Sequence, residues 1–117
     1  MARLSTHVLD LARGGPAVGV RIELFRLDGE RRELLCAAVT NAYGRTSEPL
    51  LEGDPLPGGE FELLFHAGDY FRASGVTLSD PPFLDRVAIR FGIDPARGSY
   101  HVPLLVAPHG YSTYRGS

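Results

Sequence analysis

The chain has 117 residues, of which 44% are hydrophobic and 22% are charged, a composition typical of a folded domain and not of a disordered chain. Its 12 basic and 14 acidic side chains leave a net charge of −2 without a basic run, which argues against nucleic acid as a partner. At this length we expect residues 1–117 to form a single domain.

The only cysteine, Cys36, excludes an internal disulfide framework. It lies in the apolar run 34–39, so we interpret it as a small hydrophobic residue and not as a nucleophile. No stretch approaches the roughly 18 apolar residues of a membrane helix, and residues 1–7 lack the apolar core of a signal peptide. We therefore expect a cytoplasmic protein that has no membrane partner.

Glycines and prolines divide the chain into short apolar segments, which is typical of a β-sandwich or barrel. Apolar and polar side chains alternate in residues 18–27, which predicts a half-buried strand whose inward set is Val18, Val20, Ile22 and Leu24. Asp28-Gly29 is a tight-turn dipeptide, and residues 33–41 follow as the returning strand. The first half of the chain therefore contains a predicted β-hairpin.

Residues 60–65 alternate in the same way and predict another strand. Residues 67–74 lose this alternation and predict a short helix that Gly75 ends. Residues 83–94 fit two patterns, because their apolar side chains suit either one face of a strand or one face of a helix. Their β-branched and aromatic content favours the strand.

Residues 99–107 and 111–116 predict a final pair of strands connected by Pro108-His109-Gly110. The inward set of the first of these strands is Tyr100, Val102, Leu104 and Val106. A period of two then places His101 on the opposite face, where an imidazole can meet a ligand or a partner surface. Pro103 cannot donate a backbone hydrogen bond, so it marks an edge or a bulge.

Three segments contain short motifs: Leu4-Ser5-Thr6-His7-Val8-Leu9-Asp10, Asn41-Ala42-Tyr43-Gly44-Arg45-Thr46, and His101-Val102-Pro103-Leu104-Leu105 followed by Gly110 to Ser117. With these motifs in this order, the chain resembles the transthyretin-like 5-hydroxyisourate hydrolases over essentially its whole length. The closing Tyr114-Arg115-Gly116-Ser117 is similar to the signature tetrapeptide of that family, which the hormone-carrying transthyretins lack. Residues 48–60 and 76–84 depart most from the family, so strand lengths there stay open.

The resemblance implies an all-β, transthyretin-like two-sheet β-sandwich with one short helix. It also implies a homotetramer, a dimer of dimers, with active sites in a channel where the dimers meet. The implied reaction is hydrolysis of 5-hydroxyisourate to 2-oxo-4-hydroxy-4-carboxy-5-ureidoimidazoline in urate catabolism. The family chemistry needs no cofactor, and we predict no metal.

Carried over by position, the resemblance implies that His7, Arg45, His101 and Ser117 are catalytic and that His7, Arg45 and Tyr114 bind the substrate. A neutral imidazole accepts a proton from water near pH 7, so one histidine would activate water and the other would orient water or substrate. Which histidine has which role stays open. Arg45 offers a planar set of N–H donors for ring carbonyls and a developing oxyanion. Ser117 would add a hydroxyl and the α-carboxylate.

Other functions also fit a β-sandwich, because one fold serves many functions. A small-ligand carrier would use a largely apolar channel, which two histidines and an arginine do not suit. A structural or adhesive module would be expected to show a signal segment or repeats. A zinc site is disfavoured because none of the four histidines are paired at short ligand spacing. His66 and His109 match no family position, and we expect them to be structural or exposed.

Overall fold

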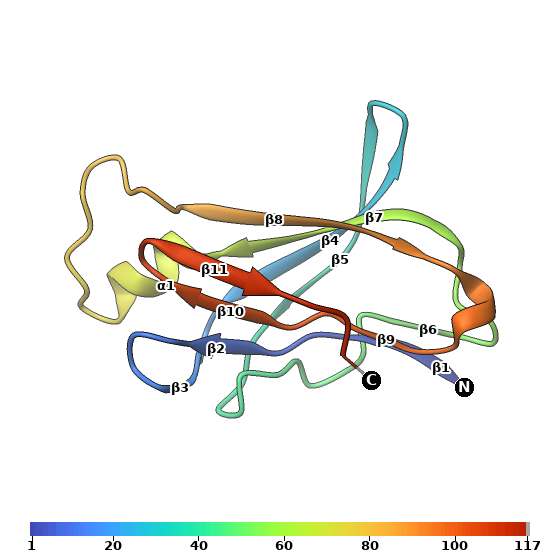
Figure 1. Cartoon of the computed structure of the whole chain (residues 1–117), viewed down its shortest axis with the longest axis horizontal. Helices are drawn as coiled ribbons and strands as arrows, with labels where there is room; N and C mark the ends of the chain where they lie inside the picture. The colour runs from blue at the N-terminus through green and yellow to red at the C-terminus, as the bar shows by residue number, and fades with distance from the viewer. Residues whose placement is uncertain (117) are drawn as a thin grey trace.

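The computed structural model describes residues 1–116. Two β-layers pack face to face, and a short helix, α1 (Ala67–Ala73), lies at one end of them (Figure 1). Within the described residues, a single turn of 3-10 helix, η1 (Pro95–Arg97), completes the helical content. The predicted all-β sandwich with one short α-helix is confirmed.

The first layer is a four-stranded antiparallel sheet in the order β5-β4-β7-β8. Its strands are β4 (Arg21–Asp28), β5 (Arg31–Val39), β7 (Gly59–His66) and β8 (Arg86–Ile93). A register shift between Leu24 and Phe25 bends the β4–β5 hairpin, which projects from the layer in Figure 1.

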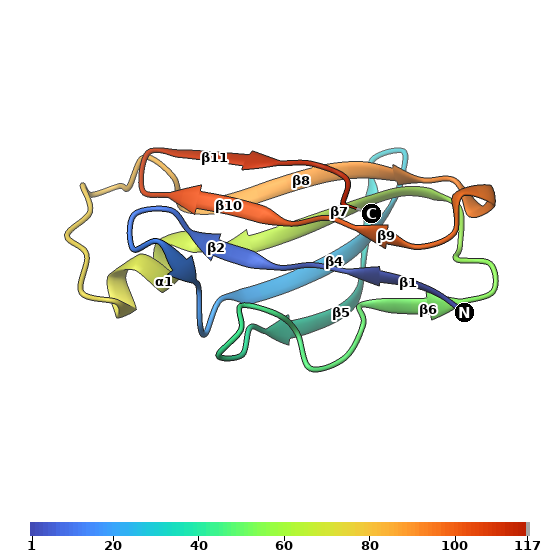
Figure 2. The ribbon, with the colours of Figure 1, turned by 60° about the horizontal axis from the view of Figure 1, so that its bottom comes forward.

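The second layer consists of two short sheets that lie end to end (Figure 2). One has the order β6-β1-β9, with β6 (Leu51–Gly53), β1 (Ala2–Ser5) and β9 (Tyr100–His101). The other has the order β11-β10-β2-β3, with β11 (Gly110–Thr113), β10 (Leu104–Ala107), β2 (Val8–Asp10) and β3 (Gly15–Pro16).

Backbone hydrogen bonds join the two halves of this layer. Val102 N donates to Ser5 O at 2.9 Å, and Leu104 N donates to His7 O at 2.8 Å. Pro103 lies between these two donors and has no N–H, so the regular ladder is interrupted there. The predicted strand 99–107 is thus two shorter strands, β9 and β10, and Pro103 lies in the interruption between them.

The core lies between the layers and receives side chains from most of the strands, together with Phe71 of α1, whereas β11 is exposed throughout. The largest wholly buried side chains are Phe61, Phe65, Phe71, Leu4, Ile22, Leu24, Leu56, Leu63, Leu104, Val8, Val20 and Val106. Burying a side chain of this size contributes about 1.5–3 kcal/mol each, so this core holds the two layers in a fixed relation.

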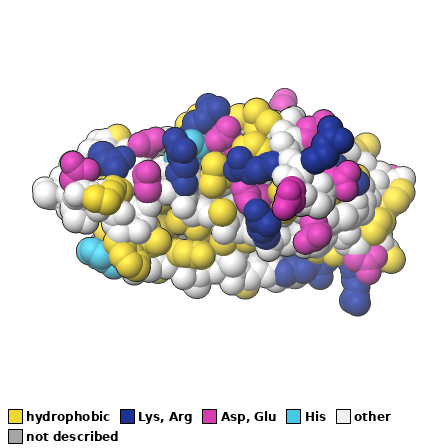
Figure 3. Space-filling model, turned by 90° about the horizontal axis from the view of Figure 1, so that it is seen from above, with side chains coloured by type: hydrophobic (Ala, Val, Ile, Leu, Met, Phe, Trp, Pro, Cys, Tyr) yellow, Lys and Arg dark blue, Asp and Glu magenta, His cyan; other side chains and the backbone are white. Residues whose placement is uncertain are grey.

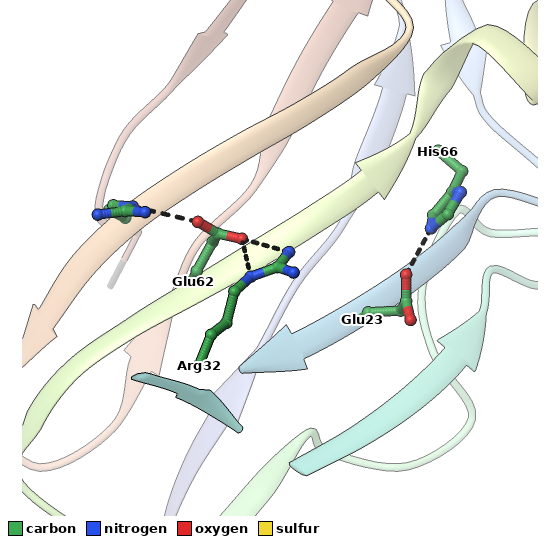
Figure 4. A network of polar contacts seen from close by, with 5 residues as sticks. Glu23, Arg32, Glu62 and His66 are labelled. Atoms are coloured by element: carbon green, nitrogen blue, oxygen red, sulfur yellow. Dashed lines mark hydrogen bonds and ion pairs between the residues drawn. The ribbon is translucent and has the colours of Figure 1, made fainter. Parts of the chain in front are cut away.

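The face above the first layer is a solvated surface on which basic and acidic side chains lie next to each other (Figure 3). Glu62, which is buried, accepts two hydrogen bonds from Arg32 at 2.7 and 3.0 Å and one from Arg90 Nε at 3.1 Å (Figure 4). Because the Glu62 carboxylate is buried, these hydrogen bonds satisfy a charge that would be costly to leave unpaired. This face does not carry the candidate site.

Most strand predictions are confirmed, with shifted boundaries. The hairpin strand begins at Arg21 and not at residue 18, because Gly19 has a φ of +85° and turns the chain, which leaves Val18 exposed. Residues 83–94 contain strand β8, so the helical alternative is wrong. Strand β11 ends at Thr113, three residues before the predicted end at 116.

Strands β1, β2, β3 and β6 had no counterpart in the sequence predictions. Their residues are few, and strands of two to four residues give too short a pattern for alternation to stand out.

None of the helices in residues 1–116 has the length and apolarity needed to cross a membrane.

Candidate active site

His7 lies in the short connection between β1 and β2, and its side chain faces away from the core. Its neighbours Thr6 and Val8 are buried, so the alternation of a strand directs His7 outward, where it is half-buried. On the core side of this segment, the buried Thr6 hydroxyl donates to Val102 O at 2.7 Å, so the hydroxyl has a hydrogen-bond partner. The backbone of His7 pairs with that of Arg45 in an isolated antiparallel bridge.

Arg45 is held by a tight loop after β5. The side-chain oxygen of Asn41 accepts from Tyr43 N at 2.9 Å and from Arg45 N at 3.3 Å, and Gly44 O accepts from Val8 N at 2.8 Å. Gly44 is buried with a φ of +74°, and a Cβ on it would lie 2.5 Å from Val8 O, so only glycine fits. The loop is thereby fixed against β2, and the Arg45 side chain remains exposed.

His101 ends β9, next to Ser5 on the neighbouring parallel strand β1. Tyr100 and Val102 on either side of it are buried, so His101 faces outward as predicted and is half-buried. Ser5 Oγ and His101 Nδ1 are 2.9 Å apart. The ring centroids of His7 and His101 are 6.4 Å apart, so the two imidazoles lie on the same outer face of the second layer.

The segment after β11 returns to His101 (Figure 2). Gly116 N donates to His101 O at 2.7 Å. Arg115 Nη2 donates to the carbonyl oxygens of Arg97 and Ser99, at 3.3 and 3.0 Å, and its guanidinium carbon lies 4.2 Å from the centre of the Tyr100 ring. These contacts place the end of the described chain beside the imidazole.

Tyr114 directly follows strand β11. It lines a cavity of about 240 Å³ between the edges of β8 and β11, which it shares with Ile89, Phe91 and Tyr100, and its side chain is largely exposed. The predicted role of Tyr114 in substrate binding stays a prediction. Ser117 lies outside the described residues.

Burial lowers the pKa of the His7 imidazole below its ordinary value, and the positive charge of Arg45 lowers it further. Burial also lowers the pKa of His101, to which Arg45 and then His7 add. An imidazole that ordinarily titrates near 6.5 is therefore neutral at pH 7 at both positions. The site presents two proton acceptors and one permanent cation.

A cavity of about 280 Å³ lies beside this group on the outer face, and its lining includes Ser5, Thr6 and Arg45. The remaining lining residues are Arg3, Thr46, Ser47, Glu48 and Pro49. Charged, hydroxyl and apolar groups line it together, and neither His7 nor His101 is among its lining residues.

The other two histidines and Cys36 lie elsewhere. His66 Nε2 donates to Glu23 Oε1 at 2.6 Å on the first layer (Figure 4), and His109 is exposed with its ring 6.1 Å from that of Phe83. Cys36 is half-buried against the core, and burial raises the pKa of its thiol. Within residues 1–116, no group of three His, Cys, Asp or Glu side chains converges as a metal site would require.

The structure adds Ser5 to the residues that contact this site, and it shows that Arg115 contacts Ser99 and Tyr100, the residues just before His101. The motif around His7 contains Ser5 two positions earlier, so a strand reading of residues 2–10 would have placed both side chains on one face. Arg115 belongs to the closing tetrapeptide, but its contacts with Ser99 and Tyr100 depend on where the tail returns.

Residues 4–116 match the family model described as the HIUase/Transthyretin family. The chain is 57% identical to the 5-hydroxyisourate hydrolase 2 of Rhizobium meliloti (strain 1021), over 98% of this chain and 96% of that protein. The solved Klebsiella pneumoniae 5-hydroxyisourate hydrolase is similar with a TM-score of 0.81 and 40% identity, over 100% of both chains. Sea bream transthyretin in complex with thyroxine is similar with a TM-score of 0.84 and 25% identity, over 97% of this chain and 94% of that one. The chain belongs to the HIUase/Transthyretin family.

Proposed function

We propose that this chain hydrolyses 5-hydroxyisourate, in urate catabolism, to 2-oxo-4-hydroxy-4-carboxy-5-ureidoimidazoline. That the chain is a hydrolase follows from relatives with more than half of their residues identical over nearly the whole length. The single observation that supports the proposed substrate and chemistry best is the grouping of His7, His101 and Arg45 on one outer face. This set contains what the opening of a polar ring by water requires.

In the proposed step, a neutral imidazole takes a proton from water, and the water oxygen bonds to a ring carbonyl carbon. The carbonyl oxygen becomes an oxyanion, which the Arg45 guanidinium stabilises by charge and by its N–H donors. The carbon–nitrogen bond then breaks, and the leaving nitrogen takes the proton that the imidazole received. The lowered pKa values of His7 and His101 support this cycle, because both side chains are ready to accept a proton at neutral pH.

Substrate binding in this proposal uses His7 and Arg45 directly, with Tyr114 as a predicted contributor, and Ser117 stays a predicted catalytic residue. The hydroxyl and guanidinium groups that line the cavity beside Arg45 support a small, flat substrate that offers several carbonyl acceptors. The alternative of a small-ligand carrier has less support. The transthyretin that is similar in structure shares 25% identity, whereas a hydrolase shares 57%, and the paired histidines are unsuited to an apolar ligand.

A homotetramer, a dimer of dimers, is part of the proposal. Leu11 and Tyr111 are exposed apolar residues, with 52% and 45% of their surfaces accessible. Leu11 directly follows β2 and Tyr111 lies near the start of β11, so both lie at the same end of the second layer. Exposed apolar side chains on one side of a molecule are typical of an interface. Light scattering combined with size-exclusion chromatography would test the assembly. The expected cytoplasmic location stays a prediction.

The test of the proposed function is to add the purified protein to a urate oxidase reaction and to follow the transient ultraviolet absorbance. An enzyme accelerates the decay of this signal above its spontaneous rate in proportion to protein concentration, whereas a carrier at catalytic concentration leaves it unchanged. Nuclear magnetic resonance of the products, collected early in the reaction, identifies the ring-opened compound. Decay at the spontaneous rate would refute the proposal.

A further inference from the structure

We propose that Ser5 is a positioning residue for this reaction: its hydroxyl oxygen accepts the Nδ1–H of His101 and leaves the Nε2 lone pair of that imidazole to take a proton from water. The inference rests on the proposed hydrolysis and deepens it. It adds a residue to the site and specifies which nitrogen of which histidine reacts.

The contact between these two side chains is built into the sheet. Ser5 and His101 are register partners on the parallel strands β1 and β9, although they are 96 positions apart in the chain. Val102 N donates to Ser5 O at 2.9 Å directly beside the pair. Since both backbones are fixed by the ladder, the distance of 2.9 Å between Ser5 Oγ and His101 Nδ1 is set by the fold and not by a mobile loop.

The hydrogen bond matters because a neutral imidazole has one N–H and one lone pair. The partner of one ring nitrogen determines which nitrogen holds the proton and hence which one can act as a base. Ser5 can accept from Nδ1–H, and this is the arrangement that leaves Nε2 free to receive a proton. The positive charge of Arg45 disfavours the doubly protonated ring, so the choice between the two neutral forms decides the chemistry.

The same contact distinguishes the two histidines. Within residues 1–116, His101 has a side-chain partner for its ring and His7 has none. A general base is recognised by a second group that orients it, as an acidic residue orients the histidine of a hydrolytic triad. Ser5 therefore assigns water activation to His101, and His7, at 6.4 Å, is left to orient water or substrate.

The test compares the wild type with Ser5→Ala, with Ser5→Thr, which keeps a hydroxyl, and with Ser79→Ala as a matched control. Ser79 lies in the exposed loop before β8, and its hydroxyl donates to Pro81 O. Nitrogen-15 resonances of the imidazoles report which nitrogen is protonated, and the His101→Asn variant identifies the signals of His101. Steady-state kinetics on freshly generated 5-hydroxyisourate give kcat and KM for each variant.

We expect a protonated Nδ1 and an unprotonated Nε2 for His101 in the wild type, in Ser5→Thr and in Ser79→Ala. In Ser5→Ala the proton should move to Nε2, and kcat should fall about tenfold or more with a smaller change in KM, since general base catalysis is worth 10²–10⁴-fold. A proton on Nε2 in the wild type would overturn the proposal. So would a Ser5→Ala protein with an unchanged protonation pattern or unchanged kcat.

Failure of this inference can be separated from failure of the proposed function. If the wild type does not accelerate the decay of 5-hydroxyisourate, the hydrolysis is refuted, whatever the resonances show. If the wild type is active and the resonances contradict the expected protonation of His101, the role of Ser5 alone is refuted. Circular dichroism and size-exclusion chromatography confirm that each variant is folded and assembled as the wild type is.

Discussion

The backbone N–H of Gly116 donates to the carbonyl oxygen of His101 at 2.7 Å, and the same glycine lies against the imidazole ring. A Cβ built on Gly116 would come within 2.8 Å of His101 Cδ2. Backbone and ring are therefore in contact where any larger residue would displace one of them. This relationship ties the closing tetrapeptide to one of the proposed catalytic side chains.

Gly116→Ala should lower activity by roughly tenfold to a hundredfold while the fold is kept, because small displacements of a reacting group are costly to catalysis. The added methyl group must move either the tail or the His101 ring. The measurement is kcat/KM in the ultraviolet decay assay. Gly110→Ala is the matched control, since a Cβ there meets nothing within 4 Å. Equal activity of the two variants would contradict this view of the tail.

Arg45→Gln should move the acid limb of the pH–rate profile to higher pH. The guanidinium lowers the pKa of His7 and of His101 by disfavouring the imidazolium forms, so its removal raises both pKa values. The neutral imidazole, which is the active form, predominates above the pKa. The wild type should therefore retain a given fraction of its own maximal activity down to a lower pH than the variant does. Histidine proton resonances followed against pH measure the same pKa values without turnover.

The control for this experiment is Arg3→Gln, which removes an exposed positive charge that lines the same cavity. Arg3 does not contribute to the lowered pKa of either histidine. An equal shift in the two variants would mean that net charge, and not the position of Arg45, determines the titration.

His101→Asn should abolish hydrolysis while the protein stays folded and assembled. Asparagine can keep one polar contact with Ser5, but it cannot take a proton from water. Because general base catalysis contributes about 10²–10⁴-fold, the loss of kcat should be of at least the lower size. Near-wild-type turnover of freshly generated substrate would show that His101 is not catalytic.

Thr40→Val should destabilise the fold by about 1–3 kcal/mol, the cost of leaving buried polar groups without partners. The buried Thr40 hydroxyl accepts from Val20 N at 2.9 Å and donates to Ala17 O at 2.7 Å, so valine would leave both groups unsatisfied. Urea unfolding at one fixed protein concentration measures the change. The exposed Thr77→Val should differ from the wild type by less than about 0.5 kcal/mol. Similar losses for both would contradict this account of Thr40.

The sequence predicted the local elements well where alternation extended over many residues. The β4–β5 hairpin and β7 were predicted from alternation and turn residues, α1 from the loss of that alternation before Gly75, and β8 from its β-branched and aromatic content. Short strands such as β1 and β2 were missed, since three or four residues do not establish a period. The alternation that assigned Tyr100 and Val102 to the core also predicted that His101, which lies between them, faces outward.

By itself, the sequence determined the class of fold, the alternation that separates core from surface and, through its motifs, the family. Only the tertiary structure decided that Ser5 faces His101, that the backbone of His7 pairs with that of Arg45 and that Tyr114 shares a cavity with residues of β8. The physical reason is distance along the chain. Local propensities act over a few neighbours, whereas the packing of two layers around one core brings together residues nearly a hundred positions apart.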